Sequence, residues 1–571
     1  MTRPILSVEN LKIRFGQTNV VNEVSFILEK GEMLALVGES GSGKSATALS
    51  IMGLLPEQAK TSGQILFEGR DLLTLPPRQR RGLRGNNLSM IFQEPMTSLN
   101  PVYSVGAQIA ESLRAHQNLS SRQARVRTIE LLELVNIPDP HRRIDDFPHQ
   151  LSGGQRQRVM IAMAIACEPK LLIADEPTTA LDATVQASIM ALLNQLRREL
   201  SLSVLMITHD LGLVSQWADK VAVMHNGNIV EQGSADRLFH HPVHDYTRGL
   251  MAASLMDSHN LHYRQCRLTE IRHDESGKFQ LYQPETLVFS HKSEAQANSP
   301  LLSVDGLNVS YIQGRSSISA LKNITFDLHF GETLGLVGES GCGKSTLSRS
   351  ILQLLRPDNG KILLEGVNVA DKKGPALKKF RQSVQMIFQD PYASLNPRHT
   401  IFTILDSVLQ LHDPAPAPKR LQRIHTMLDW VGLPRDSLHR YAHEFSGGQR
   451  QRIGIARALI IKPRLVICDE AVSALDVSVQ AQILNLLLEM KQEFGLSYLF
   501  ISHNLSVVRY MSDRVLVMNN GEIVETGSVE HIWQRPQHPY TQELLSAVKG
   551  ASGEDSRSMS LTPPYTEKYL V

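Results

Sequence analysis

The sequence predicts an α/β protein built from two tandem copies of one domain, and three observations carry this prediction. The pattern G-x-x-x-x-G-K-[ST] occurs twice, at 38–45 and at 338–345. Each occurrence follows an apolar run that is typical of a buried strand (33–37 and 333–337) and precedes a helix-competent segment. The motifs that follow recur in the same order in both copies, so the repeat is a duplication of a whole domain.

Both glycine-rich segments have the composition of a loop that holds nucleotide phosphates. Glycines let backbone N–H groups turn inward around the phosphates, and the N-terminus of the next helix adds its dipole. Lys44 and Lys344 can reach the outer phosphates, and the hydroxyls of Ser45 and Ser345 are placed for Mg²⁺. The expected nucleotide-binding residues are Gly38, Glu39, Ser40, Gly41, Ser42, Gly43, Lys44, Ser45 and Ala46, and Gly338, Glu339, Ser340, Gly341, Cys342, Gly343, Lys344, Ser345 and Thr346.

An acidic pair ends a second apolar run in each copy. Asp175 and Glu176 follow the run 170–174, and Asp469 and Glu470 end the corresponding run of the second copy. An aspartate at the end of a buried strand can hold Mg²⁺, and the glutamate beside it can orient and polarise an attacking water. Alone, such a pair is more often a helix N-cap, but the phosphate loop upstream favours nucleotide chemistry.

A Ser-Gly-Gly-Gln tetrapeptide opens a basic, helix-competent run in each copy. A serine hydroxyl and unpaired N–H groups at a helix start can bind an anion, although an ordinary capped helix has the same pattern. Ser152 lies 23 residues before Asp175, and Ser446 lies 23 residues before Asp469, which argues against coincidence. The two tetrapeptides are Ser152, Gly153, Gly154 and Gln155, and Ser446, Gly447, Gly448 and Gln449.

The order of these motifs resembles the ATP-binding cassette (ABC) family of ATPases. The first loop is followed by Gln93, Leu-Ser-Gly-Gly-Gln, the Asp-Glu pair, Ala-Leu-Asp and His209. The second copy has the same order, with Gln389, Phe-Ser-Gly-Gly-Gln and His503. The resemblance covers roughly 500 of the 571 residues. It implies two P-loop NTPase domains, each with a RecA-like core, an antiparallel β subdomain and a helical subdomain.

In this family two cassettes pack head to tail, and ATP lies between the loop of one cassette and the signature of the other. The resemblance therefore pairs Lys44 with Ser446, and Lys344 with Ser152. One chain supplies both halves, which raises their effective concentration.

The resemblance also implies roles for single residues. The catalytic groups would be Glu176 and Glu470 together with His209 and His503, which contact the γ-phosphate. The residues implied to hold Mg²⁺ are Ser45, Gln93, Asp175, Ser345, Gln389 and Asp469.

Four further residues are implied to complete the ATP sites. Asp182 and Asp476 would bridge the two sites, and Phe15 and Tyr311 would stack on adenine. A strand-core role remains open for Phe15. Because both copies keep the glutamate, histidine and serine, we predict two hydrolysis-competent sites whose rates can differ.

The composition fits a globular protein that has no nucleic-acid partner. The net charge is +2 and the hydrophobic content is 42%. The four cysteines are scattered with no C-x-x-C pair, which favours a reducing cytosol and predicts neither zinc nor a disulfide. The sequence has no apolar run of membrane-spanning length and no secretory signal at its start.

If such an ATPase drives transport, the pore must be formed by other polypeptides. The expected partners are two transmembrane permease subunits and an extracytoplasmic solute-binding protein. The chain would be peripheral, at the cytoplasmic face of the inner membrane.

The repeat defines the expected domain boundaries. Segments 242–247 and 536–541 match at an offset of 294 residues, and the second contains His-Pro-Tyr-Thr. We expect ABC domains with C-terminal extensions at 1–256 and 301–550, a linker at 257–300 and a disordered tail at 551–571. Within the linker, 268–271 and 279–282 are compatible with a β-hairpin.

The His-Pro-Tyr-Thr element resembles the extension of the dipeptide, oligopeptide and nickel importer ATPases. Fused members of that group serve peptide-type importers, including glutathione importers, and the sequence leaves peptide, glutathione and nickel open as cargo. Some relatives carry an iron–sulfur cluster in the extension. Only Cys266 lies near either extension here, so we expect no cluster.

The alternatives from other classes are a soluble tandem cassette that acts on ribosomes and a DNA-repair ATPase. The sequence lacks the zinc-binding insertions or long coiled coils of the DNA-repair class.

Overall fold

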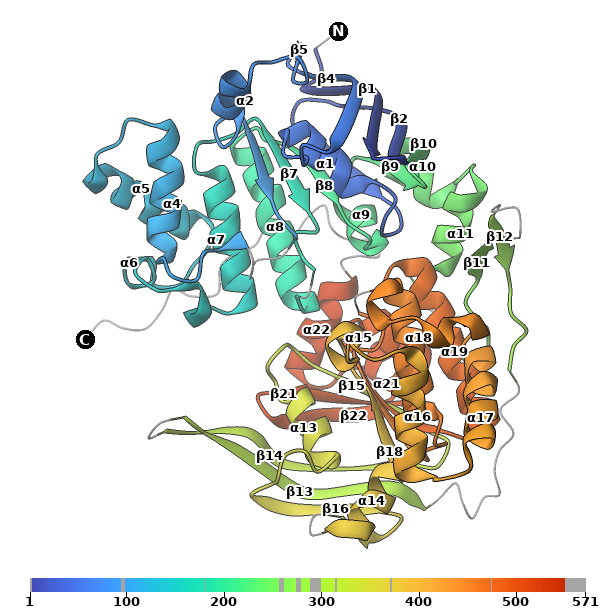
Figure 1. Ribbon diagram of the computed structural model, residues 1–571. Helices are drawn as coiled ribbons and strands as arrows, with labels where there is room; N and C mark the ends of the chain where they lie inside the picture. The colour runs from blue at the N-terminus through green and yellow to red at the C-terminus, as the bar shows by residue number, and fades with distance from the viewer. Residues whose placement is uncertain are drawn as a thin grey trace, which may run out of the picture.

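The protein forms two α/β halves of the same architecture that lie against each other (Figure 1). The structure is a computed structural model, which describes residues 3–93, 98–179, 181–255, 261–273, 279–287, 299–313, 316–369, 372–473 and 475–549. Each half has one mixed six-stranded sheet and one antiparallel four-stranded sheet. This duplicated α/β architecture confirms the fold class that the sequence predicts.

The first half alternates strands and helices around its six-stranded sheet, in the order β10-β9-β3-β8-β7-β6. Its strands are β1 (Leu6–Phe15), β2 (Thr18–Leu28), β3 (Met33–Val37), β4 (Ala59–Phe67), β5 (Arg70–Asp71), β6 (Leu88–Ile91), β7 (Leu171–Asp175), β8 (Ser203–Ile207), β9 (Lys220–His225) and β10 (Asn228–Ser234). Its helices are α1 (Lys44–Met52), α2 (Pro77–Leu83), α4 (Val105–His116), α5 (Ser121–Leu134), α6 (Pro140–Arg143), α7 (Gly153–Ile165), α8 (Ala183–Glu199), α9 (Leu211–Trp217), α10 (Ala235–His240) and α11 (Asp245–Ala253).

The second half repeats this plan with the sheet order β18-β19-β20-β15-β21-β22. Its strands are β13 (Pro300–Gln313), β14 (Ser316–His329), β15 (Thr333–Val337), β16 (Asn359–Leu364), β17 (Val367–Asn368), β18 (Val384–Ile387), β19 (Leu465–Asp469), β20 (Ser497–Ile501), β21 (Arg514–Asn519) and β22 (Glu522–Ser528). Its helices are α13 (Lys344–Ile351), α14 (Gly374–Ser383), α15 (Pro391–Ser394), α16 (Ile401–His412), α17 (Ala417–Trp430), α18 (Gly447–Leu459), α19 (Val477–Phe494), α20 (Leu505–Met511), α21 (Val529–Gln534) and α22 (Pro539–Lys549).

The central strands β3, β8 and β7 run parallel and are buried along their whole length, like their counterparts β15, β20 and β19. Helices cover both faces of such a sheet, so its strands are continuous apolar runs without alternation. The register places Ile207 of β8 between two partners. Leu36 of β3 lies on one side of it and Asp175 of β7 on the other. The carboxyl ends of the three strands therefore form one edge of the sheet.

Each half has a helical subdomain that stands beside the sheet. In the first half, α4, α5 and α6 lie at the outer side of α7 (Figure 1). The buried cluster that includes Ile109, Leu131 and Ile161 joins these helices to the core under β7. Within the part of the chain that the structure describes, no helix combines the length and the apolar character needed to cross a lipid bilayer.

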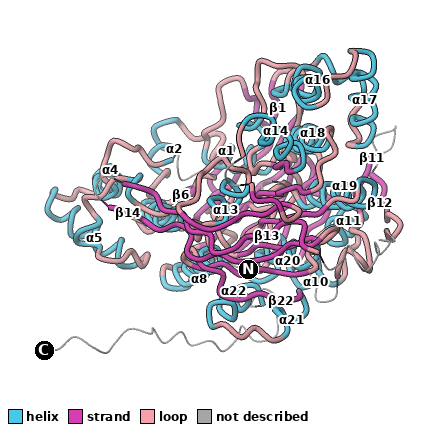
Figure 2. The backbone as a smooth tube through the Cα atoms, turned by 90° about the horizontal axis from the view of Figure 1, so that it is seen from below, coloured by secondary structure: helices cyan, strands magenta, loops and turns pink. Residues whose placement is uncertain are grey.

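The segment between the repeats is partly packed onto the second half. Strands β11 (Glu270–His273) and β12 (Phe279–Tyr282) pair antiparallel as a hairpin. The hairpin lies beside α11 of the first half and α19 of the second (Figures 1 and 2). We call residues 261–273 the strap. The rest of the predicted linker includes 257–260, 274–278 and 288–298, which, like the predicted disordered tail at 551–571, lie outside the described residues.

A buried arginine anchors the strap to α19. The Arg267 side chain is only 2% exposed, and its terminal nitrogen pairs with Glu489 at 2.7 Å. Arg267 Nε donates to Asn485 Oδ1 at 3.1 Å, while Asn485 Nδ2 donates to the backbone oxygen of Leu268 at 2.8 Å. The strap therefore adds a buried polar contact to α19 of the second half.

Replacing Arg267 by alanine is expected to destabilise the second half by about 2–4 kcal/mol, because the change leaves Asn485 and Glu489 without their buried partner. In thermal unfolding, the transition of this half should move down by roughly 5–10 °C. Arg272→Ala is the matched control, since Arg272 lies on the same strap but its side chain is half exposed. An Arg267→Ala protein that melts like the wild type would show that the strap does not stabilise the second half.

Candidate functional site

The residues singled out by sequence gather at the carboxyl edge of each six-stranded sheet. In the first half the phosphate loop follows β3, His209 follows β8, Asp175 ends β7 and Gln93 follows β6. These strands are neighbours in the sheet, in the order β3-β8-β7-β6. The second half arranges its loop and His503, Asp469 and Gln389 in the same way along β15-β20-β19-β18. In parallel sheets, ligands bind at this edge.

The glycines of the phosphate loops are required by close contacts with neighbouring backbone. Gly38 has a φ of +148°, and a Cβ atom at this position would lie 2.1 Å from the backbone oxygen of Met224. Gly43 has a φ of +100°, and its Cβ atom would lie 2.7 Å from the backbone oxygen of Val20. Gly338 and Gly343 have equivalent contacts in the second loop. Only glycine fits these positions.

Each loop lysine is buried and turned toward its own loop. Lys44 Nζ donates to the backbone oxygens of Gly38 and Glu39, both at 2.8 Å. Lys344 makes the same bonds to the second loop at 2.7 and 2.8 Å. Burial lowers the pKa of Lys44. The ammonium group thus lies inside the loop, where a bound phosphate would be its partner of opposite charge.

The glutamate of the first acidic pair has three side-chain neighbours. Glu176 Oε2 accepts from Gln93 Nε2 at 2.9 Å and from Thr179 Oγ1 at 2.8 Å. Glu176 Oε1 lies 3.3 Å from His209 Nδ1. Burial alone would raise the pKa of Glu176, but the bonds from His209, Thr179 and Gln93 outweigh it and lower the pKa to about 2. The carboxylate is therefore ionised, as a base or a water-orienting group must be.

The aspartate before it has the surroundings of a ligand for a hard cation. Burial raises the pKa of Asp175 to about 6, and Ser45 Oγ donates to Asp175 Oδ1 at 3.3 Å. Burial likewise raises the pKa of Asp469 to about 6. A hydroxyl and a carboxylate are the oxygen ligands that Mg²⁺ prefers. The residues present therefore fit a magnesium ion held beside the phosphate loop.

The second acidic pair differs from the first in one contact. Gln389 Nε2 donates to Glu470 Oε2 at 2.7 Å, and His503 Nδ1 lies 3.3 Å from the same oxygen. Ser473, the counterpart of Thr179, donates its hydroxyl to the backbone oxygen of Glu470 at 3.0 Å. Burial opposes ionisation, but His503, with a further contribution from Ser473, lowers the pKa of Glu470 overall. The Glu470 side chain therefore has neighbours of the same kinds as that of Glu176, and the two pairs differ in the position of one hydroxyl.

The Ser-Gly-Gly-Gln tetrapeptides begin α7 and α18 as capping boxes. Ser152 Oγ accepts the backbone N–H of Gln155 at 3.3 Å, and Gln155 Oε1 accepts the backbone N–H of Ser152 at 3.1 Å. Ser446 and Gln449 repeat both bonds. Gly154 must be glycine, since its Cβ atom would lie 2.6 Å from Val185 Cγ1. Gly448 contacts Val479 in the same way at 2.4 Å.

The two halves meet through their phosphate loops. Asp476 Oδ1, in the second half, accepts the backbone N–H and the hydroxyl of Ser40 at 2.9 and 3.0 Å. In the opposite direction, Asp182 Oδ2 accepts the backbone N–H of Ser340 at 3.4 Å. Asp476 and Ser446 belong to the same half, so these bonds favour the head-to-tail pairing of the first loop with the second signature.

The glutamate of each loop adds a second contact across the interface. Thr184 Oγ1 donates to Glu339 Oε1 at 2.7 Å, and Ser478 Oγ donates to Glu39 Oε1. Asp182 also caps its own helix by accepting from Val185 N at 3.0 Å, whereas the Asp476 side chain makes no such cap. The two interfaces are therefore similar but not identical.

The two aromatic residues expected at adenine differ in their surroundings. Tyr311 is 41% exposed, and its hydroxyl lies 3.3 Å from Thr346 Oγ1, at the start of the helix that follows the second loop. Phe15 is half-buried and packs against the core of the antiparallel sheet. Tyr311 thus remains available beside its loop, while the contacts of Phe15 suit a core role.

Sequence reasoning missed Thr179, Thr184, Ser478 and Tyr540 as contacts of the site. Thr179 and Thr184 each lie within three residues of a predicted site residue, which was the available signal. Ser478 lies two residues after Asp476, as Thr184 does after Asp182, so the same signal was available for it. Ala180 and Ala474 of the Ala-Leu-Asp motifs lie outside the described residues.

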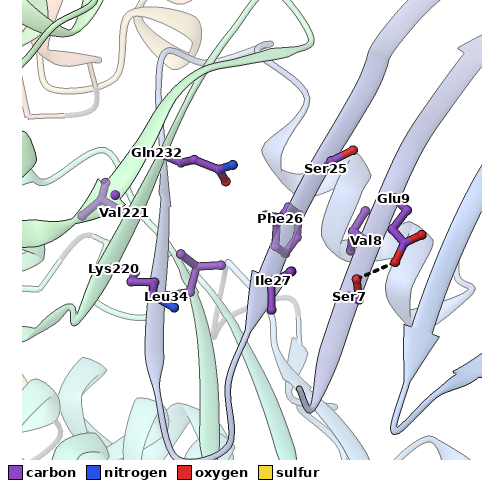
Figure 3. Close-up of a pocket in the computed structure, with 11 residues that line it drawn as sticks. Ser7, Val8, Glu9, Ser25, Phe26, Ile27, Leu34, Lys220, Val221 and Gln232 are labelled. Carbon is purple, nitrogen blue, oxygen red and sulfur yellow. Dashed lines mark hydrogen bonds between the residues drawn. The ribbon is translucent and has the colours of Figure 1, made fainter. Parts of the chain in front are cut away.

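A separate pocket of about 390 Å³ opens between the antiparallel sheet and β9 and β10 of the first half. Figure 3 shows Phe26, Ile27, Lys220 and Gln232 among the residues that line it. None of the site residues predicted from the sequence lines this pocket. It therefore plays no part in the arrangement described above.

Comparison with known proteins identifies the family. The family profile "ABC transporter" matches residues 21–179 and 321–473, and the profile "Oligopeptide/dipeptide transporter, C-terminal region" matches 230–273 and 524–569. The Glutathione import ATP-binding protein GsiA of Pectobacterium atrosepticum is 47% identical over 95% of this chain and 89% of its own length. The protein of the same name from Escherichia coli O157:H7 is 46% identical over 97% and 91%. The chain therefore belongs to the ABC transporter family, as an ATPase with two cassettes that each carry the oligopeptide/dipeptide transporter C-terminal region.

Proposed function

We propose that this chain hydrolyses ATP to drive the import of glutathione, or of a closely related peptide, through separate membrane subunits. The observation that carries the proposal is the 47% identity to a glutathione import ATP-binding protein across 95% of the chain. That match includes both cassettes, both extensions and the segment between the repeats. The peptide-transporter C-terminal region in both halves supports the same class of cargo.

The proposal assigns the chemistry to the two clusters at the sheet edges. Bound Mg²⁺ would neutralise charge on the nucleotide phosphates, held by Ser45 and Asp175 in one half and by Ser345 and Asp469 in the other. Glu176 and Glu470 would orient the attacking water, while His209 and His503 would contact the outer phosphate. The bonds of Asp476 to Ser40 support sites that are shared between the halves.

The predicted membrane partners would contact the exposed apolar side chains that lie near Gln93 and Gln389 in the sequence. Phe92, Val102 and Tyr103 are between 41% and 71% exposed in the first half. Phe388 and Tyr392 are 39% and 54% exposed in the second half. Large apolar side chains that remain exposed beside an active centre are typical of a protein interface.

In the second half, this exposed surface contacts the helix that the signature begins. Arg457 of α18 lies over the ring of Phe388 at 5.5 Å, and Arg450 lies over Tyr392 at 5.1 Å. Both arginines belong to the helix that the signature serine Ser446 begins. A partner that displaces Phe388 would therefore move the signature helix as well as Gln389, which donates to Glu470.

We further infer the setting from these relatives. Two permease subunits and an extracytoplasmic solute-binding protein would complete the importer. The chain would bind the permeases at the cytoplasmic face of the inner membrane, without nucleic acid. The proposal includes ATP and Mg²⁺ and no iron–sulfur cluster.

The test is ATPase activity of the chain, reconstituted with the membrane proteins that copurify with it and their solute-binding protein. Glutathione should stimulate turnover more than di- or oligopeptides and far more than Ni²⁺. A complex that carries Glu176→Gln and Glu470→Gln is the control and should show no stimulation. Copurification with ribosomes and no membrane protein, or stimulation by Ni²⁺ alone, would contradict the proposal.

A further inference from the structure

The tyrosine of the His-Pro-Tyr-Thr motif contacts the nucleotide loop of its own half. Tyr540 lies at the start of α22 and is 9% exposed. Its hydroxyl oxygen accepts the backbone N–H of Glu339 at 2.9 Å. Glu339 is the second residue of the phosphate loop. The C-terminal extension therefore holds the backbone of the loop directly, although Tyr540 and Glu339 are 201 residues apart in sequence.

The rest of the motif fixes where this tyrosine lies. Glu525 on β22 accepts the backbone N–H of Gln537 at 2.9 Å and that of His538 at 3.0 Å. His538 Nδ1 accepts the backbone N–H of Tyr540 at 3.2 Å. A carboxylate that holds two backbone groups makes the turn before α22 rigid. The motif thus orients the tyrosine toward the loop.

The contact continues from the loop to the other half. Glu339 Oε1 accepts the hydroxyl of Thr184 at 2.7 Å. Thr184 is in the first turn of α8, and α22 packs against α8 (Figure 1). Tyr540, Glu339 and Thr184 therefore form one series of hydrogen bonds from the extension, through the phosphate loop, to the opposite cassette.

The first half has the same tyrosine in a different environment. Tyr246 is fully buried, and its ring lies 4.1 Å from that of His225 and 5.9 Å from that of Phe279 on the hairpin. Its hydroxyl makes a looser contact with the backbone of Glu39 in the first phosphate loop. Aromatic packing adds to this looser contact of Tyr246, whereas a hydrogen bond of 2.9 Å to the loop holds Tyr540.

We propose that Tyr540 is a positioning residue for the second phosphate loop. Its hydroxyl accepts the hydrogen bond of the Glu339 backbone N–H. This bond fixes the first turn of the loop and directs the Glu339 side chain to Thr184. The extension thereby sets the nucleotide affinity of the second site and links that site to the opposite cassette. In the first site, the looser contact of Tyr246 with Glu39 takes the place of this bond. This inference rests on the proposed role of the two loops in ATP binding.

The test measures binding of a fluorescent ATP analogue with Mg²⁺ to the full chain, in two backgrounds. In the Lys44→Ala protein only the second loop is intact, and in the Lys344→Ala protein only the first loop is intact. Tyr540→Phe keeps the ring and removes the bond, so it should raise the Kd about three- to tenfold in the Lys44→Ala background. In the Lys344→Ala background it should change the Kd less than about twofold.

Four outcomes would overturn parts of this account. An unchanged Kd for Tyr540→Phe in Lys44→Ala would remove the positioning role, and an equal loss in both backgrounds would indicate a general effect on folding. Tyr246→Phe in Lys344→Ala should have little effect, and a loss as large as that of Tyr540→Phe would contradict the difference between the halves. If Lys44→Ala and Lys344→Ala both still bind two molecules of the analogue with the wild-type Kd, the assignment of the loops is wrong, and the proposed function fails independently of Tyr540.

Discussion

Replacing both Glu176 and Glu470 by glutamine is expected to slow ATP hydrolysis by about 100- to 10,000-fold. Glutamine keeps the size of the side chain but cannot take a proton or carry the negative charge that orients water. Both carboxylates are ionised in the structure because His209 and His503 lie 3.3 Å away. ATP binding should persist, because the phosphate loops are unchanged. Steady-state phosphate release measures the first effect, and retention of labelled ATP measures the second.

Glu168→Gln is a matched control for this prediction. Glu168 has a φ of +52°, close to the +49° of Glu176, but it lies on the surface and pairs with Arg127. Its replacement should leave turnover within about twofold of the wild type. Full ATPase activity in the Glu176→Gln, Glu470→Gln protein would refute the assignment of both glutamates.

Replacing Lys344 by alanine is expected to weaken ATP binding at the second loop by about 10- to 100-fold. The ammonium group lies inside the loop and would make charge-assisted hydrogen bonds with the outer phosphates, each worth about 1.5–3 kcal/mol. Lys44→Ala should have the same effect at the first loop, where the lysine is bound in the same way. Equilibrium binding of a fluorescent ATP analogue measures both.

The control for the lysines is Lys170→Ala. Lys170 is a surface residue that pairs with Glu68 at 2.9 Å, away from the phosphate loop. ATP affinity should not change when it is removed. If Lys344→Ala and Lys44→Ala each still bind two ATP molecules as tightly as Lys170→Ala, the loops are not the nucleotide sites.

Much of the fold follows from the sequence because the repeat supplies each signal twice. The apolar runs before Lys44 and Lys344 predict buried strands, and the glycines in each loop predict a tight turn that leads into a helix. The structure places both loops between a fully buried strand and a helix, with the acidic pairs two strands away. These features are local in sequence, so a pattern can reveal them.

Contacts that depend on tertiary packing were not predictable. Tyr540 reaches Glu339 only because the extension folds back over the loop, and Arg267 is buried only because the strap crosses α19. The sequence predicts a linker at 257–300 that contains a hairpin, but polar content does not show that the strap packs onto α19. The boundary at 256 stays a prediction, and the family profile of the C-terminal region extends past it to 273.

Differences between the two sites are visible in the structure but not in the motifs. Thr179 donates to the carboxylate of Glu176, whereas Ser473 donates to the backbone of Glu470. Both residues carry a hydroxyl, so the sequence alone treats them as equivalent. Unequal rates at the two sites, which the sequence leaves open, therefore have a physical basis in the positions of these hydroxyls.

The central claim is that each ATP site is formed by both halves, and trapping of nucleotide tests it most directly. In the Glu176→Gln, Glu470→Gln protein, a photoaffinity ATP analogue should label both phosphate loops. Adding Ser446→Arg should remove the label from loop 38–45 and leave it on loop 338–345. Loss of the label from loop 338–345 instead would mean that the signature serves its own half, and would contradict the head-to-tail account.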